Sequence, residues 1–254
     1  MSPTSADDDR GEQSFLSHLI ELRTRLLRAV TAWLLLTLAL IPFANKLYGK
    51  LALPFVAALP EGAQMIAIDP ASPFFTPLKL AFFVALIIAM PYVLYQIWAF
   101  VAPGLYRNEQ KLAMPLLISS TLLFYAGCAF AYFFVLPTVF GFMQAVAPDG
   151  VAVMTDITRY LDFVLVIFLA FGVTFEVPVA TVILVALGWA TVEQLKAARS
   201  YMIVAAFVIA AILTPPDVVS QLMLAIPMCI LYEIGIVAAR LVVKRRTDET
   251  ATQP

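Results

Sequence analysis

Apolar residues run along this chain in long stretches that are separated by short polar connections. A helix needs about 20 apolar residues to cross a hydrocarbon core of about 30 Å, so each long stretch predicts a membrane-spanning helix. The pattern predicts six of them, over residues 26–44, 75–101, 112–134, 161–187, 200–213 and 218–239. Prolines in or at the ends of these spans favour a bent, concave, cup-shaped bundle over straight parallel rods.

The last two predicted spans are joined by the sequence TPPD, which is too tight a connection for anything but a hairpin. At 1.5 Å per residue, the span over 200–213 covers only about 21 Å. We therefore expect the last two helices to be short. Such helices need a locally thinned bilayer or cover from other protein.

Composition agrees with this class of protein, because 62% of the residues are hydrophobic and only 13% are charged. We expect one all-α membrane domain over residues 14–240. A disordered arm over 1–13 precedes it, a polar tail over 241–254 follows it, and an apolar outer connection over 45–73 forms a folded cap. The net charge of −1 gives no general attraction to nucleic acid.

Positive charge is distributed unequally between the two sides of the predicted bundle. Of the 16 lysines and arginines, twelve fall before or at the start of the first span, in the connections 102–111 and 188–199, or after the last span. The positive-inside rule therefore predicts that both termini are cytoplasmic.

Two acids fall on this predicted cytoplasmic side. Glu21 lies in SFLSHLIELRTRLLRAV, whose apolar residues recur at helical spacing, and Glu109 lies in the connection FVAPGLYRNEQK. Each has a local explanation, since Glu21 can pair with Arg25 four residues later and Glu109 suits the first turn of the following helix. Two carboxylates on one face would also suit a ligand with two guanidinium groups.

Glu176 lies near the middle of the fourth predicted span, in FGVTFEVPV. An ionisable group at that depth favours a functional or a paired role. Pro178 cannot donate to the carbonyl of Thr174, so we expect a kink beside this acid. The alternative is a purely packing role, with Glu176 hydrogen-bonded to a neighbouring helix through Ser119, Ser120, Thr121 or Gln221.

The sequence contains no set of residues typical of an enzyme or of a metal or cofactor site. His18, the single histidine, precedes the first span, and no HExxH, GxSxG or Walker A pattern is present. The classes that remain are a polypeptide receptor and a proton- or ion-coupled transporter that uses Glu176. The chain shows no clear internal repeat, which favours the receptor.

Five motifs occur in order: SHLIELRTRL, SPFFTPLKL, YQIWAFVAPGLYRNE, FGVTFEVPV and TPPDVVSQLMLAIPM. Together they resemble the TatC family, the multi-spanning subunit of the twin-arginine protein translocase, from about residue 14 to residue 240. The resemblance implies a six-helix protein of the bacterial cytoplasmic (inner) membrane, without cofactors. Such a protein binds signal peptides with paired arginines and takes part in the export of folded proteins that the proton motive force drives.

The resemblance also implies roles for single residues. Glu21 and Glu109 resemble the acids that receive the arginine pair, with Phe100 and Leu105 beside them and Arg23 and Arg25 orienting Glu21. Glu176 resembles the intramembrane glutamate of the family.

The resemblance further implies partners. Thr214 and Gln221 resemble the contact for the single-span subunits TatB and TatA, in a complex that holds several copies. An alternative for Thr214, Asp217 and Gln221 is ordinary turn capping. Pro54 and Asp217 match outer-face motifs to which we assign no chemical role.

Overall fold

The structure of this chain, a computed structural model, describes residues 5–58, 64–101, 113–146, 154–214 and 218–251. These residues are almost entirely helical, and their β-structure is limited to one isolated bridge between Ile66 and Asp156. The helices are α1 (Ser5–Leu40), η1 (Ile41–Phe43), α2 (Ala44–Ala58), α3 (Ser72–Val101), α4 (Ala113–Phe130), the π-helical η4 (Ala131–Val135), α5 (Leu136–Ala145), α6 (Ile157–Thr174), α7 (Val177–Ala186), α8 (Val192–Ala197), α9 (Arg199–Leu213) and α10 (Val218–Ala251). The prediction of an all-α fold is confirmed.

Within the described ranges, five stretches are long and apolar enough to cross a membrane: His18–Leu53, Ser72–Val101, Met114–Ala145, Ile157–Ala186 and Val218–Val243. Helix α9 is a shorter apolar helix of 15 residues, about 22 Å long. The prediction that the last two helices are both short was wrong for α10, whose apolar part has 26 residues. The predicted span ended at residue 239, before Arg240, but a helix can continue across such a residue because a long arginine side chain can reach toward polar surroundings.

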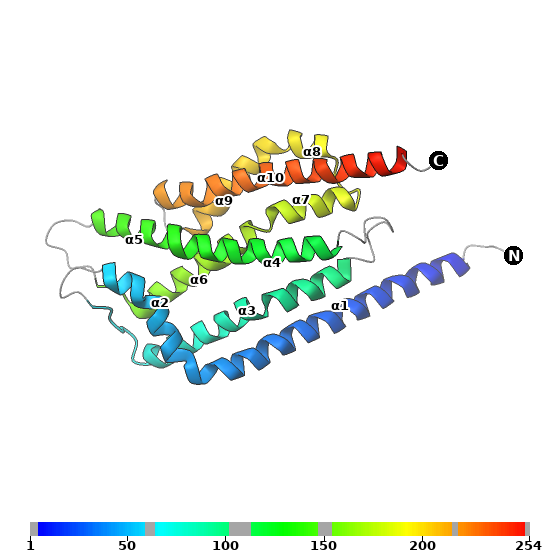
Figure 1. Cartoon of the computed structure of the whole chain (residues 1–254). Helices are drawn as coiled ribbons and strands as arrows, with labels where there is room; N and C mark the ends of the chain where they lie inside the picture. Colours follow the sequence, from blue (N-terminus) through cyan, green and yellow to red (C-terminus); the bar gives the residue numbers. More distant parts are fainter. Residues whose placement is uncertain (1–4, 59–63, 102–112, 147–153, 215–217, 252–254) are drawn as a thin grey trace.

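The helices lie side by side as a bent bundle (Figure 1). Helices α1 and α3 pack together at one edge, α4 packs on α6 in the middle, and α10 packs on α7 and α9 at the other edge. The first turns of α1 and the last turns of α10 lie at the same end of the bundle. Helix α1 already begins at Ser5, within the segment predicted to be a disordered arm, and α10 continues to Ala251, within the predicted polar tail.

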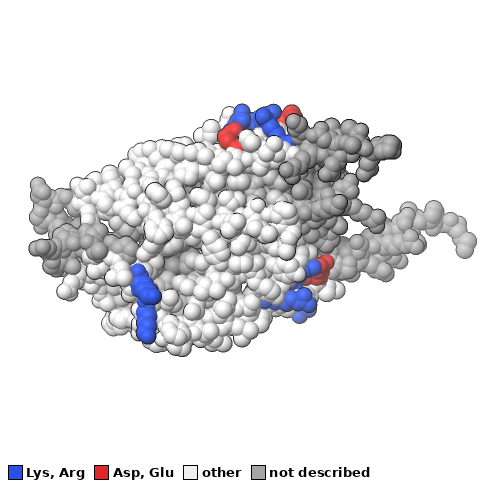
Figure 2. Space-filling view, viewed as in Figure 1, with Lys and Arg blue, Asp and Glu red and all other residues white. Residues whose placement is uncertain are grey.

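Charged side chains gather toward the two ends of the visible face, and the band between them is uncharged (Figure 2). Most of the visible Lys and Arg lie toward the end that carries both termini. A broad uncharged band between polar ends is what a bilayer requires of a spanning bundle.

The first predicted span does not end in a simple loop. Pro42 follows the last turn of α1, and the chain bends there before α2 begins at Ala44. Phe55 of α2 is buried against Tyr160 of α6, with ring centroids 4.7 Å apart, and the Tyr160 hydroxyl donates to the carbonyl of Leu51 (3.2 Å). Residues 44–58 thus use their apolar side chains to cover one end of α6.

The connection after α2 is fastened to the start of α6. Ile66 donates its N–H to the carbonyl of Thr155 and accepts from the N–H of Ile157, both at 3.0 Å. The carboxylate of Asp156 accepts from Ile68 N–H (3.3 Å) and, as the N-cap of α6, from Arg159 N–H (3.2 Å). One acid therefore both caps a helix and holds a segment from the other half of the chain.

The third span is longer than the sequence predicted, because α4, η4 and α5 form one continuous apolar stretch from Met114 to Ala145. The π-helical turn of η4 lies directly before Pro137. Proline has no N–H to donate and its ring crowds the preceding turn, which a wider π-turn relieves. Pro137 is thus accommodated within the continuous helical stretch.

Helices α4 and α6 touch through two glycines. A Cβ atom built on Gly127 would lie 2.5 Å from the backbone oxygen of Phe171, and one built on Gly172 would lie 2.6 Å from the ring of Phe124. Real Cβ atoms do not approach other atoms so closely. These glycines therefore set the distance between the two helices that carry the interior of the bundle.

We expect Gly127→Ala to destabilise the protein by about 1 to 3 kcal/mol, because the opposing atom belongs to backbone and cannot rotate away. The control is Gly141→Ala on α5, where an added Cβ meets nothing within 4 Å and a better helix former is introduced. Thermal unfolding in detergent measures both. Equal behaviour of the two variants would show that α4 and α6 are not tightly apposed.

Candidate functional site

Glu21 lies on α1 and is held by Arg25 one turn later. The Arg25 Nε and Nη2 atoms donate to Glu21 Oε1 at 2.9 and 2.5 Å. The Glu21 side chain remains 37% exposed, and Oε2 accepts no hydrogen bond from the described part of the chain. The structure thus contains the local pair that the spacing allowed, and it leaves one carboxylate oxygen open.

His18 and Phe100 form a stacked pair beside this acid. Their ring centroids are 4.2 Å apart and their planes are inclined by 22°. Since residues three apart share a helix face, His18 places Phe100 of α3 next to the turn that carries Glu21. The structure therefore brings Glu21, Arg25 and Phe100 together at the end of the bundle that carries both termini.

His18 was not predicted to belong to this group, since the sequence showed only a single histidine before the first span. Its spacing of three from Glu21 was the available signal. The partner Phe100 is 82 positions away on another helix, so the stack itself could not be read from local pattern.

Arg23 lies on a different face of α1, because two residues turn a helix by about 200°. It makes no ion pair or hydrogen bond with Glu21 in the described structure, so the orienting contact belongs to Arg25 alone. The expectation that Arg23 also orients Glu21 finds no support in this geometry.

Glu109 and Leu105 lie in the connection 102–112, outside the described residues. That connection begins directly after α3, whose penultimate residue is Phe100. Their membership of the site stays a prediction.

Glu176 lies where the fourth span breaks. Helix α6 ends at Thr174, α7 begins at Val177, and Glu176 is the N-cap of α7 in front of Pro178. The predicted kink beside this acid is confirmed. The break is small, because Glu176 N–H donates to Val173 O (3.0 Å) and its carbonyl accepts from Ala180 N–H (2.9 Å).

The Glu176 carboxyl group has one partner on a neighbouring helix. Ser120 Oγ of α4, itself buried, donates to Oε2 at 2.5 Å. The other oxygen, Oε1, is buried and accepts no hydrogen bond within the described residues. A buried polar atom without a partner costs free energy. Oε2 therefore joins α7 to α4 through Ser120, and Oε1 is available for another contact.

The residues expected at the partner contact and on the outer face are only partly described. Buried Thr214 ends α9 and its hydroxyl donates to Ala210 O (2.8 Å), which is local capping. Gln221 is half-buried on the first turn of α10. Asp217 lies outside the described residues, and Pro54 belongs to α2 with its side chain undescribed.

The fold and these sites define a polytopic α-helical membrane protein with an acidic site at one end and a glutamate inside its bundle. Comparison with known proteins then identifies the family. Residues 17–227 match the family model described as Sec-independent protein translocase protein (TatC). This chain belongs to the TatC family.

Two relatives and one solved structure illustrate the similarity. The TatC protein of Haemophilus influenzae is 53% identical over 241 residues, which is 95% of this chain and 94% of that protein. The TatC protein of Escherichia coli (strain K12) is 54% identical over 228 residues, covering 90% and 88%. A crystal structure of "Twin Arginine Translocase Receptor- TatC" superposes with a TM-score of 0.79 at 39% identity, covering 89% of this chain and 99% of that one.

We expect Ser120→Ala to destabilise the protein by about 1 to 3 kcal/mol, because both oxygens of Glu176 then lack a partner. Ser120→Ala combined with Glu176→Leu should recover part of this loss, since no polar group then remains unpaired. Chemical unfolding in mixed micelles measures both variants. If Ser120→Ala had the same free energy of unfolding as the unchanged protein, the hydrogen bond between Ser120 and Glu176 would not contribute to stability.

Proposed function

We propose that this chain is the receptor subunit of a twin-arginine translocase. It binds signal peptides that carry an arginine pair and takes part in the export of folded proteins that the proton motive force drives. The observation that carries this proposal is the half-exposed Glu21 carboxylate, held by Arg25 beside the stacked His18 and Phe100. The relatives named above are translocase proteins, and none supports the alternative of an ion-coupled transporter.

The geometry of Glu21 favours a guanidinium ligand. Both bonds from Arg25 end on Oε1, so Oε2 can accept from a second cation without displacing Arg25. A planar guanidinium can bond this oxygen and a further acceptor at once, whereas a lysine ammonium is a point charge.

Glu109 supplies the second carboxylate in this proposal. Glu21 alone cannot bind two guanidiniums bidentately, because Arg25 already occupies one of its oxygens. The connection 102–112 starts beside Phe100 and carries both Glu109 and Leu105. Phe100 and Leu105 then offer an apolar surface to the residues that follow the arginine pair.

The membrane orientation is part of the proposal. Most lysines and arginines lie in the first part of α1, in the last part of α10, or in the sequence segments 102–111 and 188–199. Those visible in Figure 2 lie mostly toward the end of the bundle that carries both termini. By the positive-inside rule this end faces the cytoplasm, where newly made precursors are present. We therefore place the chain in the bacterial inner membrane with both termini and the Glu21 site on the cytoplasmic side.

Helix α9 is the proposed contact for the single-span subunits TatB and TatA. Its length of about 22 Å falls short of a hydrocarbon core of about 30 Å. It also exposes large apolar side chains: Ile203, Val204, Phe207, Val208 and Ile212. A partner helix beside Thr214 and Gln221 would cover this surface and shield the short helix from bilayer strain.

Glu176 is the proposed contact for a translocating chain or a partner helix inside the bundle. Its buried Oε1 is an acceptor without a donor among the described residues. A hydrogen-bond donor from a second polypeptide would remove that cost, which makes contact at this point favourable.

We expect Glu109→Lys and Glu21→Gln to weaken binding of an Arg-Arg signal peptide at least tenfold, because each removes a carboxylate from the pair. Binding of TatB should change much less. Site-specific photocrosslinking from positions beside Glu21, with Arg-Arg and Lys-Lys versions of one peptide in native membranes, measures the effect. Equal crosslinking of both peptides, with the protein folded and TatB bound, would move the binding site elsewhere.

We expect Glu176→Gln to impair export while the complex still assembles. The glutamine carbonyl can accept from Ser120 as Glu176 does, so packing is retained and only the second function of the group is changed. Export of a reporter and co-purification with TatB measure the two properties separately. Wild-type export by this variant would assign Glu176 to packing alone.

A further inference from the structure

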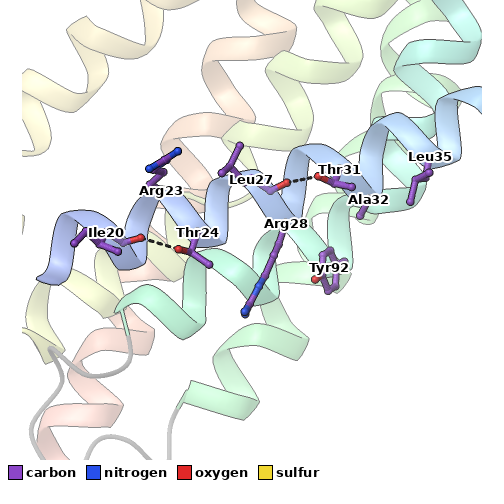
Figure 3. A pocket seen from close by; sticks show the side chains of 9 residues that line it. All are labelled: Ile20, Arg23, Thr24, Leu27, Arg28, Thr31, Ala32, Leu35 and Tyr92. Carbon is purple, nitrogen blue, oxygen red and sulfur yellow. Dashed lines mark hydrogen bonds between the residues drawn. The ribbon is translucent and has the colours of Figure 1, made fainter.

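A groove of about 510 Å³ runs along the outside of α1, next to Tyr92 of α3 (Figure 3). It begins near Ile20 and ends near Leu35, along the middle and later turns of α1. Glu21, His18 and Phe100 do not line it. The groove is therefore separate from the proposed peptide site, although both lie on the same helix.

Two arginines stand on either side of this groove. Arg23 and Arg28 are five positions apart, which separates them by about 140° around the helix, and Figure 3 shows them pointing away from opposite edges of α1. Neither forms an ion pair with any described residue, whereas Arg25 is neutralised by Glu21. No acidic residue lines the groove, so it carries two uncompensated positive charges.

The surface between the two arginines consists of leucine side chains and of threonines whose hydroxyl groups are already hydrogen-bonded to the backbone. Leu27 and Leu35 are 54% and 62% exposed. The hydroxyls of Thr24 and Thr31 donate to the carbonyls of Ile20 (2.8 Å) and Leu27 (2.7 Å), as the dashed lines in Figure 3 show. These hydroxyl protons are already used, so the groove recognises polar ligands chiefly through the two guanidiniums.

This arrangement selects an amphiphilic anion. The charged part of the groove lies toward the start of α1, and Leu35 lies seven residues beyond Arg28, about 10 Å farther along the span. An arginine at this depth is costly unless it meets water or a fixed anion. Guanidinium groups bind phosphate with two parallel hydrogen bonds, and basic pockets at the membrane surface bind anionic head groups.

We propose that this groove binds one anionic phospholipid, with its phosphate at the guanidinium of Arg28, the charge of Arg23 adding to the attraction from the other edge of α1, and an acyl chain along Leu27 and Leu35. A twin-arginine peptide is excluded by charge, because it would bring two more cations to an already positive groove. The inference therefore does not depend on the proposed signal-peptide site, and the two can fail separately.

The experiment compares two photoactivatable lipids, phosphatidylglycerol and phosphatidylcholine, in vesicles that contain the purified full chain. We expect phosphatidylglycerol to label residues 20–35 selectively. Arg23→Gln combined with Arg28→Gln should reduce this labelling about tenfold. The matched control is Lys196→Gln with Arg240→Gln, which removes two cations from α8 and α10 and should leave labelling of 20–35 unchanged.

A second variant tests the groove without removing charge, at an exposed position where a substitution should not disturb the fold. Leu27→Trp leaves both arginines in place, adds bulk to an exposed position and should block labelling by filling the groove. Equal labelling by both lipids, or unchanged labelling in the double arginine variant, would overturn the proposal. Crosslinking of this segment to a second copy of the chain in place of lipid would overturn it too.

Discussion

Backbone groups inside a bilayer have no water to bond, so every break in a spanning helix needs protein around it. The fourth span shows how this constraint shapes the whole bundle. Pro178 follows the interruption at Glu176, and α4 packs against the end of α6 just before it, close enough only because Gly127 and Gly172 lack side chains. The buried bond from Ser120 then fixes the acid at that point. A helix break, a close helix contact and a polar side chain are thus parts of one arrangement.

Hydropathy alone was enough to predict the five long apolar stretches and the shorter α9, because the cost of placing polar residues in hydrocarbon is large and local. The kink at Glu176 was also predictable, since proline removes a hydrogen bond that no distant contact can restore. The length of α10 was not, because a cation such as Arg240 can reach the surface along its own side chain while the helix continues. The third span was predicted to end at residue 134, whereas the helical stretch passes Pro137 through a π-turn and continues to Ala145.

At the candidate site, local spacing predicted the pair of Glu21 and Arg25 because both lie on one helix. The stack of His18 on Phe100 joins two helices and could not be predicted from spacing. The resemblance to the TatC family implied that Arg23 helps to orient Glu21, but helical geometry separates these two residues by about half a turn. Neighbouring arginines on α1 therefore have different environments. Arg25 is neutralised within the protein, and Arg23 and Arg28 face outward without a carboxylate among the described residues.

The hydrogen bonds between the connection after α2 and the start of α6 have a consequence for the order of assembly. Ile68 is held by Asp156, which follows it by 88 residues, so the connection after α2 cannot be fastened until the fourth span is being made. At about 5 to 20 residues per second, a ribosome needs roughly 4 to 18 seconds to make that stretch. During this interval α1, α2 and α3 are present without α6, against which Phe55 later packs. The first half of the chain therefore stays incomplete, at the end of the bundle opposite the termini, until the second half has been made.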